Sequence, residues 1–400
     1  MSATTTTNVG LALTQGPWPY FAPDEVEAAT RVLQSGKVNY WTGTEGRDFE
    51  REFAAWAGTR HAIAMSNGTV TLEAALMALG IGPGDEVVVT PRTFMASASC
   101  VVTVGATPVF ADVDPDSGNL TAETIAAVLS PRTKAIIPVH LAGWPCEIDA
   151  LLDLCRAHNL HLIEDCAQAH GSTYRGRSVG SFGVINSWSF CQDKIMTTGG
   201  EGGMITLDCD GLWSRLWSLK DHGKSYDAVY RREHAPGFRW LHESFGTNYR
   251  MTEMQSAIGR VQLRKLPDWV AARRAHAARL TEVLRDLPTL RIPEPGPHMQ
   301  HAYYKYYAYL NAEALKPDWS QMRIIQEVES RGFKLFSGSC SEVYREKAFT
   351  SRGIGPVQPL PVARTLGETS LMMLVHPTLS PDYVIATAEA LRDVLQSAQR

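Results

Sequence analysis

The chain has 400 residues, 44% hydrophobic and 20% charged, which is the composition of a globular protein with ample material for a large core. Its formal net charge of −4 gives no basic excess that would point to nucleic acid or an anionic membrane as a partner. The seven cysteines include no C-x-x-C pair, which argues against a disulfide framework and a zinc site and suits a reducing cytoplasm. We therefore expect a cytoplasmic protein without a bound metal.

The N-terminal segment, residues 1–16, begins MSATTTTN, which has neither the basic start nor the apolar core of a signal peptide. We expect this segment to be a disordered tail. No apolar run reaches the roughly 18 residues of a membrane helix. The following residues, to about 58, are expected to form an arm and a helix that pack against a folded domain.

Residues 60–210 alternate between short apolar runs and helical stretches. This alternation predicts an α/β domain with a mostly parallel sheet, in which ligands bind beyond the carboxyl ends of the strands. The predicted strands are His61–Met65, Glu86–Thr90, Thr107–Val113, Lys134–Val139, Leu160–Asp165, Val184–Phe190 and Gly203–Leu207, and the predicted helices are Gly68–Leu79, Phe94–Val104, Ala122–Leu129 and Ile148–His158.

The last third of the chain has a different pattern. Two helices, Met251–Lys265 and Val270–Leu287, are expected to be interrupted at Pro267. The Pro-rich bend 292–297 then precedes further predicted elements, which are a strand (Tyr303–Leu310), a helix (Ser320–Arg331) and a C-terminal helix (Pro381–Ser397). We predict a large domain over 17–270, including the arm, and a smaller α+β domain over 271–400.

Lys194 lies just beyond an apolar strand and just before the glycine-rich run TTGGEGG. A lysine that forms a Schiff base needs a site that desolvates its ammonium, and neighbouring glycines let the backbone pass close to a ligand. A solvated lysine in a surface turn is an equally serious interpretation of this segment alone.

Asp165 ends a predicted strand, where a buried carboxylate needs a cation. The protonated ring nitrogen of pyridoxal phosphate (PLP) is such a cation, and Gln168 is placed to bond the hydroxyl of the same ring. Taken on its own, Asp165 is explained slightly better as a helix-capping aspartate.

Two further segments fit the same cofactor. Gly68 and Thr69 open a helix whose N-terminus can bind a phosphate, and Ser189 can add a hydroxyl. Phe94 follows a strand and can stack on an aromatic ring. Simple capping and an ordinary core aromatic are the alternatives. The order of the segments favours a PLP site, because four unrelated coincidences would otherwise have to align.

These segments resemble the DegT/StrS-type PLP-dependent aminotransferases of fold type I, which act on nucleotide-linked keto sugars. The resemblance is carried by SNGTVTLEAAL, IEDCAQAHGS, the SF…K…TTGGEGGM block, GTNYRMTEMQSAIGRVQL and SEVYREKAF, and it extends from about Pro17 to the C-terminal helix.

The resemblance implies that Lys194 forms the Schiff base and shuttles protons, and that Asp165 pairs with the ring nitrogen. Gln168, Phe94, Gly68, Thr69 and Ser189 are implied as cofactor contacts. Asn248 is implied to reach the phosphate from a partner subunit, which makes the enzyme a homodimer with shared active sites. The implied reaction moves an amino group from glutamate to the keto sugar in two half-reactions, with pyridoxamine phosphate as the intermediate cofactor form.

Substrate contacts are less defined. Arg250 can bind the carboxylate of the amino donor, although an interface salt bridge explains it nearly as well. The segment 221–246 contains Arg231, Arg232, His234 and Arg239, which can bind a nucleotide diphosphate or simply belong to a solvated loop.

Three other functions remain as alternatives. The first is another PLP enzyme, such as a sugar dehydratase or an amino-acid aminotransferase; some relatives that are dehydratases carry histidine in place of the lysine, whereas this chain keeps Lys194. The second is a binding or regulatory protein on the same fold, against which intact Lys194 and Asp165 argue. The third is a nucleotide-binding dehydrogenase, which lacks the G-x-G-x-x-G turn after the first strand.

Overall fold

The computed structural model describes residues 16–400. Most of the tail predicted for residues 1–16 therefore lies outside the described part of the chain. No helix within the described range has the length and apolar character needed to cross a membrane.

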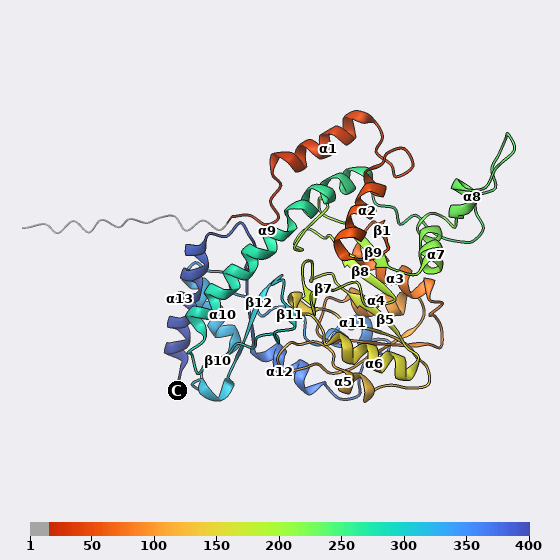
Figure 1. The fold of residues 1–400 in the computed structure, drawn as a ribbon. Helices are drawn as coiled ribbons and strands as arrows, with labels where there is room; N and C mark the ends of the chain where they lie inside the picture. Colours follow the sequence, from red (N-terminus) through yellow and green to blue (C-terminus); the bar gives the residue numbers. More distant parts are fainter. Residues whose placement is uncertain (1–15) are drawn as a thin grey trace, which may run out of the picture.

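The large domain is built on a seven-stranded sheet in the order β1-β9-β8-β5-β4-β2-β3 (Figure 1). The strands from β8 to β3 run parallel to their neighbours, whereas β9 is antiparallel to both β1 and β8. The predicted α/β fold with a mostly parallel sheet is thus confirmed. The strands are β1 (His61–Met65), β2 (Glu86–Val89), β3 (Thr107–Phe110), β4 (Thr133–Ile137), β5 (His161–Asp165), β8 (Ile185–Ser189) and β9 (Gly203–Leu207).

Side chains on both faces of this sheet are buried. Val87 and Val89 join one hydrophobic cluster, and Val88 between them joins another on the opposite face. Such double burial explains why the strands read as continuous apolar runs. The helices that surround the sheet are α2 (Glu45–Ala57), α3 (Gly68–Ala78), α4 (Ala96–Thr103), α5 (Ala122–Ala126), α6 (Ile148–His158), α7 (Asp210–Lys220) and the short 3₁₀ turn η1 (Leu141–Gly143).

Helix α9 (Glu253–Leu284) is a single 32-residue helix that contains Pro267. The predicted interruption at Pro267 is therefore wrong. An internal proline costs a helix roughly 3 kcal/mol, but Leu266 and Val270 beside it are buried, and this packing offsets the loss. In Figure 1, α9 runs from the large domain to the smaller lobe, and α1 (Pro23–Ser35) lies along it.

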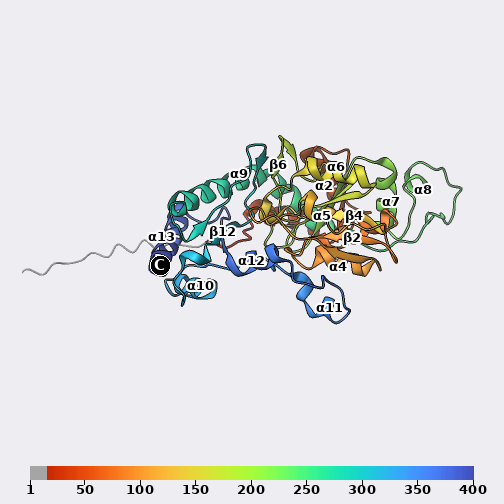
Figure 2. The same ribbon diagram turned by 90° about the horizontal axis from the view of Figure 1, so that it is seen from below.

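The smaller lobe contains an antiparallel sheet in the order β10-β12-β13. Figure 2 shows this lobe beside the large domain, with α10 and α13 on it. The predicted strand Tyr303–Leu310 begins only at Tyr306, because Tyr303 has a left-handed backbone with φ 51°. The elements here are β10 (Leu290–Arg291), β12 (Tyr306–Leu310), η2 (Ala312–Ala314), α10 (Gln321–Ser330), η3 (Val343–Arg345), α11 (Lys347–Thr350), α12 (Pro361–Thr369), β13 (Ser370–Met373) and α13 (Pro381–Ala398).

We propose that the boundary between the two domains lies within α9, near residue 270. Val270 still packs with the large-domain cluster around Trp188, whereas Ala277 and Leu284 pack with the core of the smaller lobe. A third, small sheet of β6 (Thr173–Tyr174), β7 (Arg177–Ser178) and β11 (Met299–Gln300) joins segments from both sides of that boundary.

Residues 221–246 form an extension, which we call the projecting arm. It contains the short helix α8 (Tyr226–Tyr230) and protrudes from the end of the large domain near α7 (Figure 1). Three of its aromatic side chains are strongly exposed: Phe238 is 78%, Trp240 81% and Phe245 101% exposed. The arm thus presents apolar surface that no described part of its own chain covers.

Candidate active site

A cavity of about 820 Å³ opens beyond the carboxyl ends of β5 and β8. Its walls come from the turn before α3, the segment before α4, the ends of β5 and β8, and the small domain. The lining residues that the sequence singled out are Gly68, Thr69, Phe94, Asp165, Gln168, Ser189 and Lys194. Seven residues predicted from separate segments of the sequence therefore line one cavity. Their roles in cofactor binding stay predictions.

Lys194 lies in the turn that follows β8 and is half-buried. Its backbone N–H donates to the carbonyl of Cys191 at 3.1 Å, and its own carbonyl accepts from the indole N–H of Trp18 at 3.0 Å. Its Nζ atom lies 5.1 Å from the centre of the Tyr304 ring. The N-terminal arm and the small domain thus both contact the lysine.

Asp165 is the last residue of β5 and is only 4% exposed. One carboxylate oxygen accepts from the Ser97 hydroxyl at 2.8 Å, and the other accepts from the Ala167 N–H at 3.1 Å. Burial raises the pKa of Asp165, and this effect outweighs the hydrogen bonds and the charge of Lys194, which lower it. Within residues 16–400 no cationic side chain forms an ion pair with this carboxylate.

Gln168 lies three residues beyond Asp165 and is 5% exposed. Its side-chain Oε1 accepts from the N–H of Ala142 at 2.7 Å. Ala142 has a left-handed backbone with φ 55°, a conformation that an alanine rarely adopts. The amide of Gln168 is therefore held in place by a strained turn that sequence patterns do not predict.

The first residue of α3, Gly68, approaches β8 very closely. A Cβ atom added to Gly68 would lie 2.6 Å from the Ser189 Cβ, so only glycine fits there. The side chain of Asn67 caps the helix by accepting from the N–H groups of Thr69 and Val70, both at 3.0 Å. The helix N-terminus and the Ser189 hydroxyl therefore face the same part of the cavity.

Phe94 lines the cavity and is 70% exposed. It precedes α4, which begins at Ala96 rather than at Phe94 as predicted. The ring is consequently not a core aromatic, which was the alternative interpretation.

Six predicted residues do not line this cavity, namely Asn248, Arg250, Arg231, Arg232, His234 and Arg239. The backbone of Asn248 forms an isolated antiparallel β-bridge with that of Asp221, and the Arg250 guanidinium donates to the buried carboxylate of Asp221 at 2.6 Å. Arg231 pairs with Asp227 on the surface, and Arg239 donates to the carbonyl of Val229 at 2.9 Å. Arg250 therefore forms a salt bridge within its own chain. Arg231 and Arg239 pair with residues of the projecting arm itself.

The sequence patterns did not single out several residues of the cavity wall, among them Ser97, Asp193 and Tyr304. Ser97 bonds Asp165, and a polar residue in the apolar face of a predicted helix was the signal for it. Tyr304 lines the cavity from the small domain and is 7% exposed, although the sequence predicts it only as part of the strand Tyr303–Leu310.

His140, Glu164 and Cys166 form a buried group with the spacing of metal ligands. The Nδ1 atom of His140 accepts from the N–H of Cys146, and its Nε2–H donates to Glu164, each at 3.0 Å. The Glu164 carboxylate also accepts three backbone N–H groups, from Gly180, Phe182 and Gly183. Hydrogen bonds within the protein thus already use these atoms, and the group fastens the loop 180–183 to β5.

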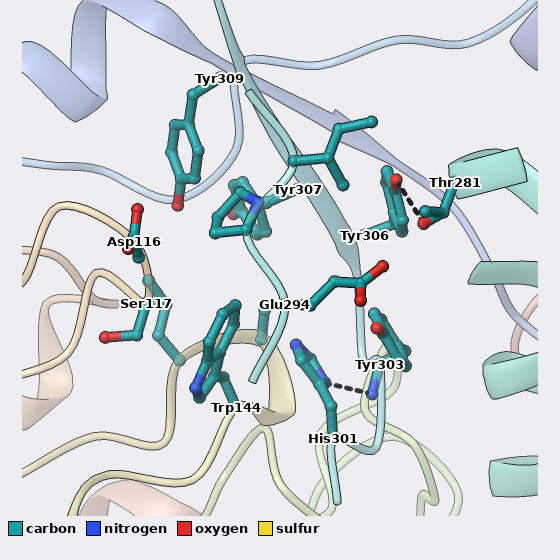
Figure 3. Close-up of a pocket in the computed structure, with 14 residues that line it drawn as sticks. Asp116, Ser117, Trp144, Thr281, Glu294, His301, Tyr303, Tyr306, Tyr307 and Tyr309 are labelled. Carbon is teal, nitrogen blue, oxygen red and sulfur yellow. Dashed lines mark hydrogen bonds between the residues drawn. The ribbon is translucent and has the colours of Figure 1, made fainter. Parts of the chain in front are cut away.

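A second cavity lies between the large domain and the smaller lobe (Figure 3). Trp144, His301 and several tyrosines surround it, and the His301 ring stacks on Tyr303 with centroids 3.9 Å apart. Its volume of about 20 Å³ holds about one water molecule. It is therefore too small for a substrate.

The fold and the cavity define an α/β aminotransferase of fold type I. The chain belongs to the DegT/DnrJ/EryC1/StrS aminotransferase family, whose model matches residues 19–392. It is an enzyme of the aminotransferase class, and the dehydrogenase alternative is thereby excluded.

An aminotransferase from Psychrobacter cryohalolentis has a similar structure, with 56% identity, a TM-score of 0.94 and coverage of 96% of this chain and 99% of that one. GDP-perosamine synthase from Caulobacter vibrioides is 47% identical over 58% of this chain and 61% of its own length. UDP-N-acetyl-3-dehydro-alpha-D-glucosamine 3-aminotransferase from Acidithiobacillus ferrooxidans is 35% identical over 94% of this chain and 96% of its own length.

Proposed function

We propose that this enzyme binds PLP at Lys194 and transfers an amino group from glutamate to a nucleotide-linked keto sugar. The observation that carries the proposal is the convergence of Lys194, the buried Asp165 carboxylate and the α3 N-terminus on one cavity. Membership in the aminotransferase family, whose members depend on PLP, supports the same cofactor.

The residues around the cavity fit PLP chemically. Asp165 is a buried carboxylate with a raised pKa, and no cationic side chain pairs with it in the described part of the chain. A protonated ring nitrogen would supply the missing cation. The α3 N-terminus, Thr69 and Ser189 suit a phosphate, and Phe94 is free to cover an aromatic ring. When bound, the cofactor supplies an electron sink that makes the α-proton of an amino acid acidic.

Lys194 and Asp165 then have distinct roles. Lys194 holds the cofactor and, once its Nζ is free, removes a proton from the substrate carbon and returns it. Asp165 keeps the ring nitrogen protonated. Two half-reactions at one lysine predict ping-pong kinetics.

The proposal that the substrate is a nucleotide-linked sugar rests on the names of two relatives. One relative is named for a GDP-linked sugar and another for a UDP-linked sugar, so the class supports a nucleotide sugar without defining the base. In the projecting arm, Arg231 and Arg239 are our candidates for binding the diphosphate of the nucleotide sugar. Arg250 is our candidate for binding the carboxylate of the amino donor.

We also propose a homodimer in which Asn248 reaches the phosphate of the partner subunit. The exposed aromatic side chains of the projecting arm support this assembly, because isolated monomers rarely expose such apolar surface. The absence of Asn248 and Arg250 from the cavity of their own chain is consistent with a shared site. The free cysteines support a cytoplasmic location, which cell fractionation would test.

The decisive experiment follows the first half-reaction. Glutamate alone should convert the cofactor to pyridoxamine phosphate and release one equivalent of 2-oxoglutarate, and a panel of nucleotide-linked keto sugars should then restore PLP. Lys194→Ala should purify without the absorbance of lysine-linked PLP. Unchanged absorbance in this variant would overturn the lysine assignment, and release of water from the sugar without amino transfer would favour the dehydratase alternative.

A further inference from the structure

Tyr304 connects the small domain to the turn that carries Lys194. Its hydroxyl donates a hydrogen bond to the Asp193 carboxylate. Two ammonium groups lie near its ring, with Lys194 Nζ 5.1 Å and Lys305 Nζ 4.7 Å from the ring centre. Its carbonyl accepts from the guanidinium of the buried Arg273 at 3.1 Å.

Charges of both signs lie around Lys194, with Asp165 and Asp193 as carboxylates and Arg273 and Lys305 as cations. Asp193 is the carboxylate nearest in sequence, and burial lowers the pKa of Lys305 to about 8 and that of Arg273 to about 9. Burial and the neighbouring Asp193 raise the pKa of Tyr304 well above its ordinary value, so its hydroxyl keeps its proton and remains a donor. The charged and titratable groups that face this region are Asp165 on β5, His170 after it, Asp193 on the lysine turn, Glu201 before β9, Arg273 on α9, Lys305 before β12, Glu346 before α11 and His376 after β13.

We propose that Asp193 and Tyr304 are a positioning pair, which balances the charge around the Lys194 amine and holds the lysine turn against the small domain. The hydrogen bond from Tyr304 tempers the negative charge of Asp193, and Asp193 in turn offsets Lys305 and Arg273. This inference rests on the proposed role of Lys194 as the reactive amine. The proposal does not require Asp193 or Tyr304 to contact the substrate.

The two partners should have opposite effects when changed. Tyr304→Phe keeps the aromatic face but removes the donor, so the carboxylate of Asp193 attracts the proton of Lys194 more strongly. Asp193→Asn keeps an acceptor for Tyr304 but removes the negative charge, so Lys305 and Arg273 repel that proton. The pH at which Lys194 becomes reactive should rise in the first variant and fall in the second, each by about one pH unit.

Two readouts test this on the full-length protein. The first is competitive acetylation of Lys194 in the apoprotein across a pH series, quantified by mass spectrometry. The second is the pH dependence of the absorbance of lysine-linked PLP in the loaded enzyme. Tyr303→Phe is the matched control, because it removes a neighbouring phenol that lies outside this pair and should leave both curves unchanged.

Opposite shifts in Tyr304→Phe and Asp193→Asn, with native circular dichroism, support the pair. Shifts in the same direction would indicate a loosened turn and overturn the proposal, as would curves that match the wild type. The acetylation readout needs no cofactor, so it tests the Asp193–Tyr304 pair even if the wild-type protein fails to link PLP at Lys194. Failure of the wild-type protein to link PLP would refute the proposed function and not the pair.

Discussion

Replacing Ser97 by alanine tests the hydrogen bond that holds Asp165. The Ser97 hydroxyl lies 2.8 Å from the carboxylate and is 2% exposed, so water does not compete for it in the intact structure. A hydrogen bond to a charged group contributes about 1.5–3 kcal/mol. Because about 1.4 kcal/mol corresponds to one pKa unit, the loss should raise the pKa of Asp165 by about one to two units.

The sign of the effect on activity follows directly. A higher pKa means that Asp165 takes up its proton at higher pH, so the ring nitrogen loses its anionic partner earlier as the pH falls. The acidic limb of the kcat/KM profile should therefore move to higher pH by about one unit or more. The assay is 2-oxoglutarate release from glutamate across a pH series.

Ser99→Ala is the control, because Ser99 lies on the same helix α4 and is half-buried, while its hydroxyl does not bond Asp165. This variant should keep the wild-type profile. If Ser97→Ala also kept the wild-type acidic limb, the hydrogen bond would not tune Asp165, and the reasoning would be refuted.

Three further changes have distinct expected results. Gly68→Ala places a Cβ 2.6 Å from that of Ser189, so apoprotein titrated with PLP should bind at least about tenfold more weakly; unchanged affinity would contradict a phosphate site at this turn. Lys220→Ala leaves the largely buried Glu50 without its partner at 3.0 Å and should lower the free energy of unfolding by about 3 kcal/mol in urea, whereas a loss within error would show that Glu50 finds water instead. Trp240→Ser on the projecting arm should weaken the dimer in light-scattering measurements, and an unchanged mass across dilution would argue against a role of the arm in assembly.

The sequence predicted the sheet well because its signal is local. Most strands of the large-domain sheet are short apolar runs, and both faces of the sheet are buried, so burial and pattern agree. The strand-end rule also explains why Asp165, Ser189 and the turn before α3 were expected at one edge. Lys194 follows from the same rule, since it lies in the turn after β8.

Other features depend on contacts between distant segments, which no local pattern encodes. Pro267 remains inside α9 because packing on both sides outweighs its local cost. The left-handed Tyr303 shortens the predicted strand, and the left-handed Ala142 fixes Gln168. The position of Tyr304 against Asp193 depends on how the two domains meet, so it was not predictable from either segment alone.

The electrostatics of Asp165 explain why cofactor binding and stability should be coupled. Because burial raises the pKa of Asp165 above its ordinary value of 3.8, the stability contributed by its neutral form is present below that pH and is lost as the pH rises through the raised value. Above the raised pKa the apoprotein therefore carries a buried carboxylate held only by Ser97 and the Ala167 N–H. A cationic ring nitrogen would offset this cost in the folded state alone, so PLP should stabilise the protein more at a pH above the raised pKa than near pH 3.8.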